Sequence, residues 1–135
     1  MNDKVFFDTN ILVYSYSFTE LDKQRISRKL IEETDSYIST QVLQELVNTL
    51  TKKFGKSWDE AKKVVDESCK NNTVFSNQSK TITMACSIAD KYQYSFYDSL
   101  IISAALSSKC KILFSEDLQH GQVIEDNLRI VNPFF

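Results

Sequence analysis

Two acidic residues follow short apolar segments of the chain. Asp8 comes directly after residues 5–7, and Asp117 follows residues 112–114 after two intervening residues. Short apolar runs bounded by polar residues are typical of buried strands. If the two strands are parallel neighbours, both carboxylates open into one crevice beyond the strands' carboxyl ends. Like charges brought together there repel each other, and a divalent cation removes that repulsion.

The residue types favour a hard cation at such a crevice. Carboxylate oxygens suit Mg²⁺ or Mn²⁺ better than zinc, and no paired His/Cys set competes with them. Cys69, Cys86 and Cys110 are widely spaced, and His120 is the only histidine. This composition excludes nuclease chemistry that needs two histidines, and it makes a zinc site or a disulfide framework improbable.

Each acid also has a purely local interpretation. Asp8 could cap the helix that follows it, and Asp117 could serve in a turn. Asp98 ends the capping-box pattern Ser95-Phe96-Tyr97-Asp98, although an acid at the start of a buried helix can also project into the crevice. Glu45 falls about 140° from the apolar stripe of its helix, which by itself indicates solvent.

The predicted elements alternate between strand and helix. Only two Gly and one Pro occur in 135 residues, so connections should be short. Thr19 is a candidate N-cap, with Leu21 facing inward, and Ser57 with Glu60 forms a capping-box pattern. Ile82 and Cys86 are expected on an inward helix face. The predicted strands are 4–7, 37–38, 73–75, 111–114 and 128–131, and the predicted helices are 10–16, 19–34, 40–54, 57–70, 79–92 and 96–108.

Apolar strands separated by helices predict an α/β fold, a three-layer α/β/α sandwich with a short, mostly parallel central sheet. The length of 135 residues fits a single domain, residues 1–135. No secretory leader is recognisable, and the longest mostly apolar run, 100–106, is far shorter than the about 20 residues that span a bilayer. With the cysteine pattern, this favours a cytoplasmic protein without a membrane segment.

Four motifs resemble the PIN-domain family, in order and over essentially the whole chain. Phe7-Asp8-Thr9-Asn10 resembles the opening of the domain, and the ending Ile130-Val131-Asn132-Pro133-Phe134 is similar to that of bacterial members, in particular the VapC-like toxins. The inner motifs are Ser39-Thr40-Gln41-Val42-Leu43-Gln44-Glu45-Leu46, Tyr97-Asp98-Ser99-Leu100-Ile101 and Leu113-Phe114-Ser115-Glu116-Asp117-Leu118. Many members have Asn or Arg where Glu116 stands, so an additional acid lies beside the expected ligand, Asp117.

The resemblance implies a PIN-like nuclease domain that cleaves RNA endonucleolytically with metal-activated water. Asp8, Glu45, Asp98 and Asp117 are the implied catalytic and metal-binding residues, holding Mg²⁺ or possibly Mn²⁺. Thr9, Asn10 and Ser115 are expected to orient the carboxylates or their waters. The toxin branch further implies a homodimer and a cognate antitoxin protein.

The charge balance limits how RNA could be bound. The net charge is −2, with 16 Lys and Arg against 18 Asp and Glu, which argues against binding through a broad basic surface. Lys52, Lys53 and Lys56 form a candidate rim for RNA backbone contacts. The local pattern of these lysines favours a solvated charged face over an RNA-binding rim.

Two other classes of function remain open. One is a PIN-like binding or scaffold domain that lacks activity. The other is a phosphotransfer domain with an acidic site at a strand end. Haloacid-type phosphatases need a second Asp two residues after the first, where this chain has Asn10, and receiver domains need a Lys after a late strand, where it has Ser115-Glu116-Asp117.

Overall fold

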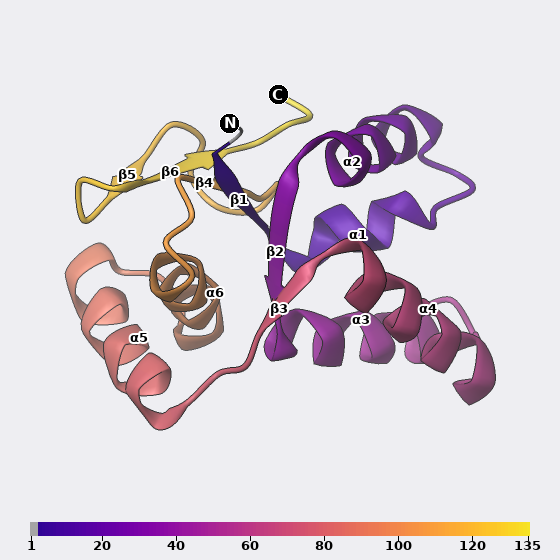
Figure 1. The fold of residues 1–135 in the computed structure, drawn as a ribbon, viewed down its shortest axis with the longest axis horizontal. Helices are drawn as coiled ribbons and strands as arrows, with labels where there is room; N and C mark the ends of the chain where they lie inside the picture. Colours follow the sequence, from indigo (N-terminus) through magenta and orange to yellow (C-terminus); the bar gives the residue numbers. More distant parts are fainter. Residues whose placement is uncertain (1–2) are drawn as a thin grey trace.

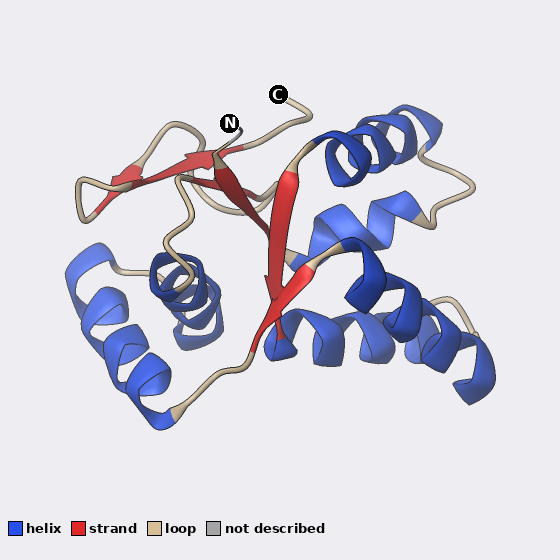
Figure 2. Cartoon of the chain, in the orientation of Figure 1, coloured by secondary structure: helices blue, strands red, loops and turns tan. Residues whose placement is uncertain are grey.

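A twisted central sheet forms the middle of the molecule in the computed structural model, which describes residues 3–135 (Figure 2). Within those residues the sheet has six strands in the order β3-β2-β1-β4-β6-β5. All neighbouring pairs are parallel except β5 with β6. The strands are β1 (Lys4–Phe7), β2 (Asp35–Ser39), β3 (Thr73–Phe75), β4 (Ile112–Phe114), β5 (Val123–Ile124) and β6 (Leu128–Val131).

Helices cover both faces of the sheet. Figure 1 shows α5 and α6 on one side and α1 to α4 on the other. The helices are α1 (Thr9–Ser15), α2 (Leu21–Glu33), α3 (Thr40–Lys52), α4 (Trp58–Asn71), α5 (Ser79–Tyr92) and α6 (Phe96–Ser107). Phe6, Ile38 and Leu113 are fully buried between the layers, as expected for parallel strands covered on both faces. The predicted α/β sandwich with a mostly parallel sheet is therefore confirmed.

The strand order reverses between β1 and β4. The chain adds β2 and β3 on one side of β1, then returns to place β4 on the other side. Their register pairs Phe7 with Phe114, so both strands end at the same edge of the sheet. In open α/β sheets, the loops beyond such a reversal part to opposite sides and leave a crevice. Asp8 and the segment 115–117 follow these two strand ends.

The start of α2 differs from its prediction. Thr19 is not the N-cap, because α2 begins at Leu21 after Glu20, whose side chain makes no capping hydrogen bond. Ser17 Oγ instead accepts from the backbone N–H groups of Thr19 and Glu20, at 3.3 and 3.1 Å. This turn uses those donors before the helix begins. It also leaves Leu21, expected to face inward, 57% exposed.

Two further differences reflect limits of periodicity. Ile82 and Cys86 are exposed, whereas Thr81, Ala85 and Ile88 form the buried face of α5. Ser103 Oγ of α6 donates to the Thr81 carbonyl at 2.7 Å, so small residues let the two helices approach closely. The two-residue strand β5 was not predicted, since so short a strand shows no period.

No helix within residues 3–135 combines the length and the apolar character that crossing a membrane requires.

Candidate metal centre

Asp8 lies buried at the junction between β1 and α1, with 7% of its surface exposed. It is the N-cap of α1, and its Oδ1 accepts from the Thr9 backbone N–H at 2.7 Å. Its Oδ2 accepts from Ser115 Oγ at 2.8 Å. The capping role therefore does not compete with a role at the strand end. Capping fixes the carboxylate at the carboxyl edge of the sheet.

The segment after β4 is held by Ser115 and Asn10. Ser115 Oγ accepts from the backbone N–H groups of Asp117 and Leu118, at 3.2 and 3.3 Å, while it donates to Asp8. Asn10 Nδ2 donates to Asp117 Oδ2 at 3.2 Å. The side chains of Ser115 and Asn10 thus join the ends of β1 and β4, and each of them holds one carboxylate, that of Asp8 or that of Asp117.

Glu45 reaches the same region from α3. Thr9 Oγ1 donates to its Oε1 at 2.5 Å, and Gln41 Nε2 donates to its Oε2 at 3.1 Å. Helical periodicity placed Glu45 toward solvent, and the structure corrects this. The N-terminal half of α3 lies beside α1 at the sheet edge, so the flank carrying Glu45 is half-buried and faces the acids.

Asp98 comes from the first turn of α6. Ser95 is the N-cap of this helix and accepts from the Asp98 backbone N–H at 3.2 Å. The capping pattern was thus interpreted correctly for Ser95, and it leaves the Asp98 carboxylate free to face the cleft. Gln41 connects the two helices, because its Nε2 also donates to the Tyr97 carbonyl at 3.0 Å.

All four acids line one cleft of about 670 Å³ at the carboxyl edge of the sheet. Within residues 3–135, no group of three or more Asp, Glu, His or Cys side chains is close enough together to hold a metal ion. A cleft of separated carboxylates nevertheless fits Mg²⁺, which usually keeps several waters and takes only one or two protein carboxylates directly. The chemistry of the donors, all of them oxygens, agrees with that preference.

The electrostatics of Asp8 support this fit. Burial raises the pKa of Asp8 from 3.8 to about 6, and the negative charges of Glu45 and Asp117 act in the same direction. The hydrogen bonds from Ser115 and Thr9 lower the pKa but do not offset the burial. A buried carboxylate surrounded by like charges is what a bound cation stabilises.

Glu20 and Glu116 also line the cleft, and Glu116 makes contacts that differ from those of the four predicted acids. Lys23 Nζ lies 2.6 Å from its Oε2, and Tyr14 Oη donates to its Oε1 at 2.5 Å. These partners hold the pKa of Lys23 above its ordinary value. Glu116 therefore carries its own counter-charge, whereas Asp117 beside it is bonded to Asn10.

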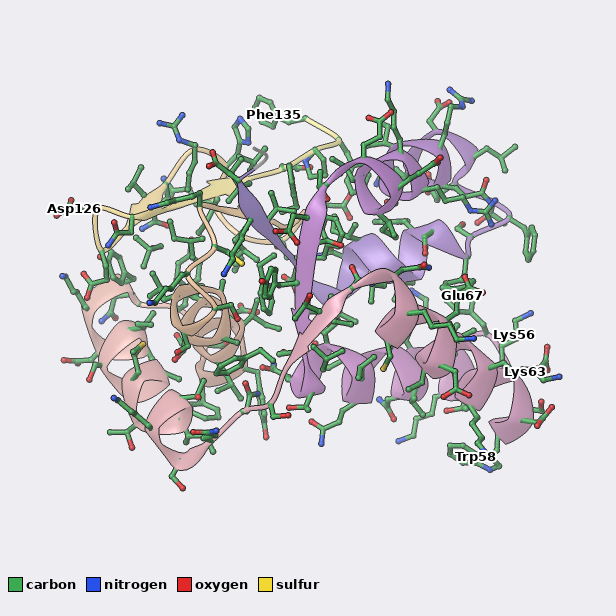
Figure 3. All side chains as sticks on the ribbon, viewed as in Figure 1. Lys56, Trp58, Lys63, Glu67, Asp126 and Phe135 are labelled. Atoms are coloured by element: carbon green, nitrogen blue, oxygen red, sulfur yellow. The ribbon has the colours of Figure 1, made fainter. Side chains whose placement is uncertain are left out.

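The three lysines expected to form a rim are separated in the structure. Lys53 lines the cleft. Lys52 is exposed at the end of α3 and does not line it. Lys56 lies in a different groove with Lys63, at the end of α3 and α4 far from the sheet (Figure 3). The predicted rim is thus reduced to Lys53.

Sequence reasoning missed Gln41, Tyr14 and Lys23. Gln41 lies one helical turn before Glu45, and this i, i+4 spacing places two residues on the same helix face, so it could have been found. Nothing in the sequence indicates Lys23, because its partner Glu116 lies 93 residues away.

Comparisons with known proteins agree with this architecture. No curated protein sequence matches the chain. Among solved structures, a toxin–antitoxin complex from Klebsiella pneumoniae matches at 17% identity with a TM-score of 0.69, covering 96% of this chain and 97% of that one. VapC20 of Mycobacterium tuberculosis, a toxin that cleaves the sarcin–ricin loop, matches at 16% identity and a TM-score of 0.69, covering 84% and 91%.

A third match is VapBC2 from Rickettsia felis bound to a promoter DNA fragment, at 18% identity and a TM-score of 0.68, covering 94% and 96%. At these identities the likeness establishes the fold. The sequence evidence is independent of it, since the profile of the PIN domain matches residues 5–125. The chain therefore belongs to the PIN-domain family.

Proposed function

We propose that this protein is a Mg²⁺-dependent endoribonuclease and the toxin of a toxin–antitoxin pair. The observation that carries the proposal is the convergence of Asp8, Glu45, Asp98 and Asp117 on one cleft at the strand reversal of a PIN fold. The toxin assignment draws support from the solved structures of similar fold, which are toxins or toxin–antitoxin complexes. As a cytoplasmic protein, it would meet both RNA and its partner.

The residues of this chain supply the binding site and its geometry. Asp8, Glu45, Asp98 and Asp117 would hold Mg²⁺, or Mn²⁺, directly or through water. When bound, the cation supplies charge compensation for the phosphodiester and Lewis-acid activation of water. Thr9, Asn10 and Ser115 fix carboxylate oxygens through the hydrogen bonds described above. Lys53 at the cleft edge is available to contact an RNA phosphate.

Two protein partners belong to the proposal. The first is a cognate antitoxin, because structures of similar fold were solved with one. The second is a second copy of this chain, as a homodimer. Large apolar side chains at the surface, among them Phe18, Trp58 and Tyr97 with 77, 75 and 66% exposure, provide contact area for such partners.

An RNA cleavage assay tests the activity. Purified wild type and Asp8→Asn are each incubated with total cellular RNA in the presence of Mg²⁺ or of EDTA. We expect defined new RNA ends from wild type in Mg²⁺ alone, mapped by sequencing. Asp98→Asn should match Asp8→Asn, and circular dichroism should show that both variants remain folded. Equal cleavage by wild type and either variant would refute the assigned site.

A further inference from the structure

Glu116 has both carboxylate oxygens bonded to neighbouring side chains. Lys23 Nζ contacts Oε2 at 2.6 Å and Tyr14 Oη contacts Oε1 at 2.5 Å. The side chains of Lys23 and Glu116 are only 30 and 25% exposed, so the pair is partly shielded from water. By contrast, Asp117 is exposed and accepts its hydrogen bond from a neutral amide.

The Lys23 ammonium is held from several directions. It lies 4.7 Å from the centre of the Tyr14 ring and 5.6 Å from that of Phe134, both distances at which a cation is attracted to an aromatic face. The two rings pack edge to face at 5.2 Å. Residues of α1, α2 and the C-terminal segment therefore fix the ammonium beside Glu116, although a lysine side chain is otherwise flexible.

The position of Lys23 beside Glu116 affects the net charge of the cleft. Six carboxylates line it, those of Asp8, Glu20, Glu45, Asp98, Glu116 and Asp117. A carboxylate without a counter-charge strengthens the capture of a divalent cation and repels an anionic phosphodiester. Paired with Lys23, Glu116 contributes no net charge. Its oxygens are also already occupied by donors.

We propose that Lys23 is a positioning residue that keeps Glu116 out of the metal-binding set, which leaves Asp8, Glu45, Asp98 and Asp117 to bind the cation. This inference rests on the proposed metal-dependent activity. It assigns different roles to two neighbouring acids: Asp117 binds the cation, whereas Glu116 forms an ion pair with Lys23.

A double-mutant cycle in the full-length protein tests the proposal. The variants are Lys23→Met, Glu116→Gln and the combination of both. The measurement is the Mg²⁺ concentration that gives half of the maximal thermal stabilisation, with calorimetric titration of Mg²⁺ as a second measurement. Lys23→Gln provides a second neutral replacement in case the methionine variant folds poorly.

The expected changes follow from the local net charge. Lys23→Met leaves Glu116 uncompensated and should lower the Mg²⁺ midpoint by about threefold to tenfold. Glu116→Gln leaves Lys23 uncompensated and should raise the midpoint by a similar factor. In the double variant the local net charge is again the same as in wild type, so its Mg²⁺ midpoint should return to within about twofold of the wild-type value. Both single effects should shrink in 0.5 M salt because exposed charges are screened.

If Glu116 is itself a ligand, the cycle gives a different result. Glu116→Gln then weakens Mg²⁺ binding by removing an oxygen, which Lys23→Met cannot restore, so the double variant stays as impaired as the single one. That result, or a Lys23→Met variant with the wild-type midpoint, overturns the proposal. Asp117→Asn provides the reference for loss of a true ligand.

The chain contains a matched control. Glu125 is bonded to Lys91 Nζ at 2.6 Å and to Tyr92 Oη at 3.0 Å, an arrangement of the same three residue types that does not line the cleft. Lys91→Met and Glu125→Gln should leave the Mg²⁺ midpoint unchanged. A shift as large as that at Lys23 would show that any change of surface charge suffices, which contradicts a specific role for Lys23.

Steady-state cleavage of an RNA oligonucleotide that carries a mapped cleavage site gives an independent readout. Lys23→Met should raise KM by about threefold to tenfold through repulsion of the phosphate, with kcat at saturating Mg²⁺ changed less than twofold. The double variant should restore KM. If wild type shows no Mg²⁺-dependent stabilisation that Asp8→Asn removes, both proposals fail. If that control behaves as expected and the double variant does not recover, only the role of Lys23 fails.

Discussion

Asp8 combines two properties that oppose each other in the absence of metal. Its hydrogen bonds to Thr9 and Ser115 fix its orientation, while burial raises its pKa from 3.8 to about 6. A raised pKa means that the folded state binds the proton more tightly than the unfolded state does. Stability of the metal-free protein therefore falls as the pH rises from about 4 to about 6, and the full penalty persists at pH 7.5.

Replacing the Asp8 carboxylate with a neutral amide should remove the free-energy cost of burying its negative charge. We expect Asp8→Asn to raise the stability of the metal-free protein at pH 7.5 by about 1–3 kcal/mol and to remove stabilisation by Mg²⁺. Urea unfolding with EDTA or with Mg²⁺ measures both effects. The exposed Asp66→Asn serves as the control and should change neither. A metal-free Asp8→Asn variant less stable than wild type would contradict the assigned cost of burial.

The structure shows that Gln41 bridges two of the helices that carry the acids, a role that the sequence analysis did not predict. It is 4% exposed, and its amide connects the Glu45 carboxylate to the Tyr97 carbonyl, next to Asp98. Gln41→Leu should reduce cleavage at limiting Mg²⁺ by about 10-fold to 100-fold, the range typical for residues that orient metal ligands. Gln44→Leu, the same change at an exposed position of α3, should have little effect. Equal activity of the two variants would argue against the bridging role.

At the scale of elements, capping decides where the helices start. Ser57 and Glu60 form the complete capping box of α4, with both reciprocal hydrogen bonds at 3.1 Å. Thr19 has a side chain of similar capping ability but does not cap α2. A favourable residue type near a helix start is thus insufficient, because the local backbone can form another turn, here the one in which Ser17 Oγ accepts from the Thr19 and Glu20 N–H groups.

The different contributions of Ser57 and Thr19 to stability can be measured directly. Ser57→Ala should lower the free energy of unfolding by about 1 kcal/mol, the usual cost of losing an N-cap. Thr19→Ala should change it by less than about 0.5 kcal/mol, as is common for surface substitutions. Urea unfolding followed by circular dichroism checks both values. A larger loss for Thr19→Ala than for Ser57→Ala would reverse the assignment of the two caps.

At the scale of the whole molecule, the fold gathers acidic side chains in a cleft that has little positive charge of its own. The net charge is −2, and Lys53 is the one cationic side chain lining the cleft within the described residues. Binding of RNA by such a protein should therefore depend on the bound cation more than on lysine contacts. We therefore expect that one substitution in the acidic cleft abolishes RNA cleavage while the fold remains unchanged.

Expression in bacteria tests the proposed toxin activity in the cell. Wild type produced without a partner should slow growth, and Asp98→Asn produced to the same level by immunoblot should not. Co-expression of a small DNA-binding protein encoded directly upstream, where one is present, should restore growth. Unimpaired growth with an enzyme shown to be active in vitro would contradict the toxin assignment and leave the nuclease assignment standing.

The sequence by itself determined every helix and strand of the described residues except β5, the parallel character of the sheet and the acids at two strand ends. These depend on local patterns: the apolar runs that precede Asp8 and Asp117, and the capping signal before Asp98. The family motifs added Glu45, which helical periodicity alone had placed toward solvent. The four acids predicted from the sequence do line one cleft, whereas the contacts that each of them makes could not be predicted.

The tertiary structure decided which groups surround each acid. Glu45 turns from a solvent position into a cleft residue because α1 lies beside α3 and brings Thr9, 36 residues away, to its carboxylate. Glu116 and Asp117 are neighbours in sequence, yet one meets Lys23 and the other meets Asn10. Such partners join segments up to 107 residues apart, and no local pattern encodes them, because they depend on how whole elements pack against each other.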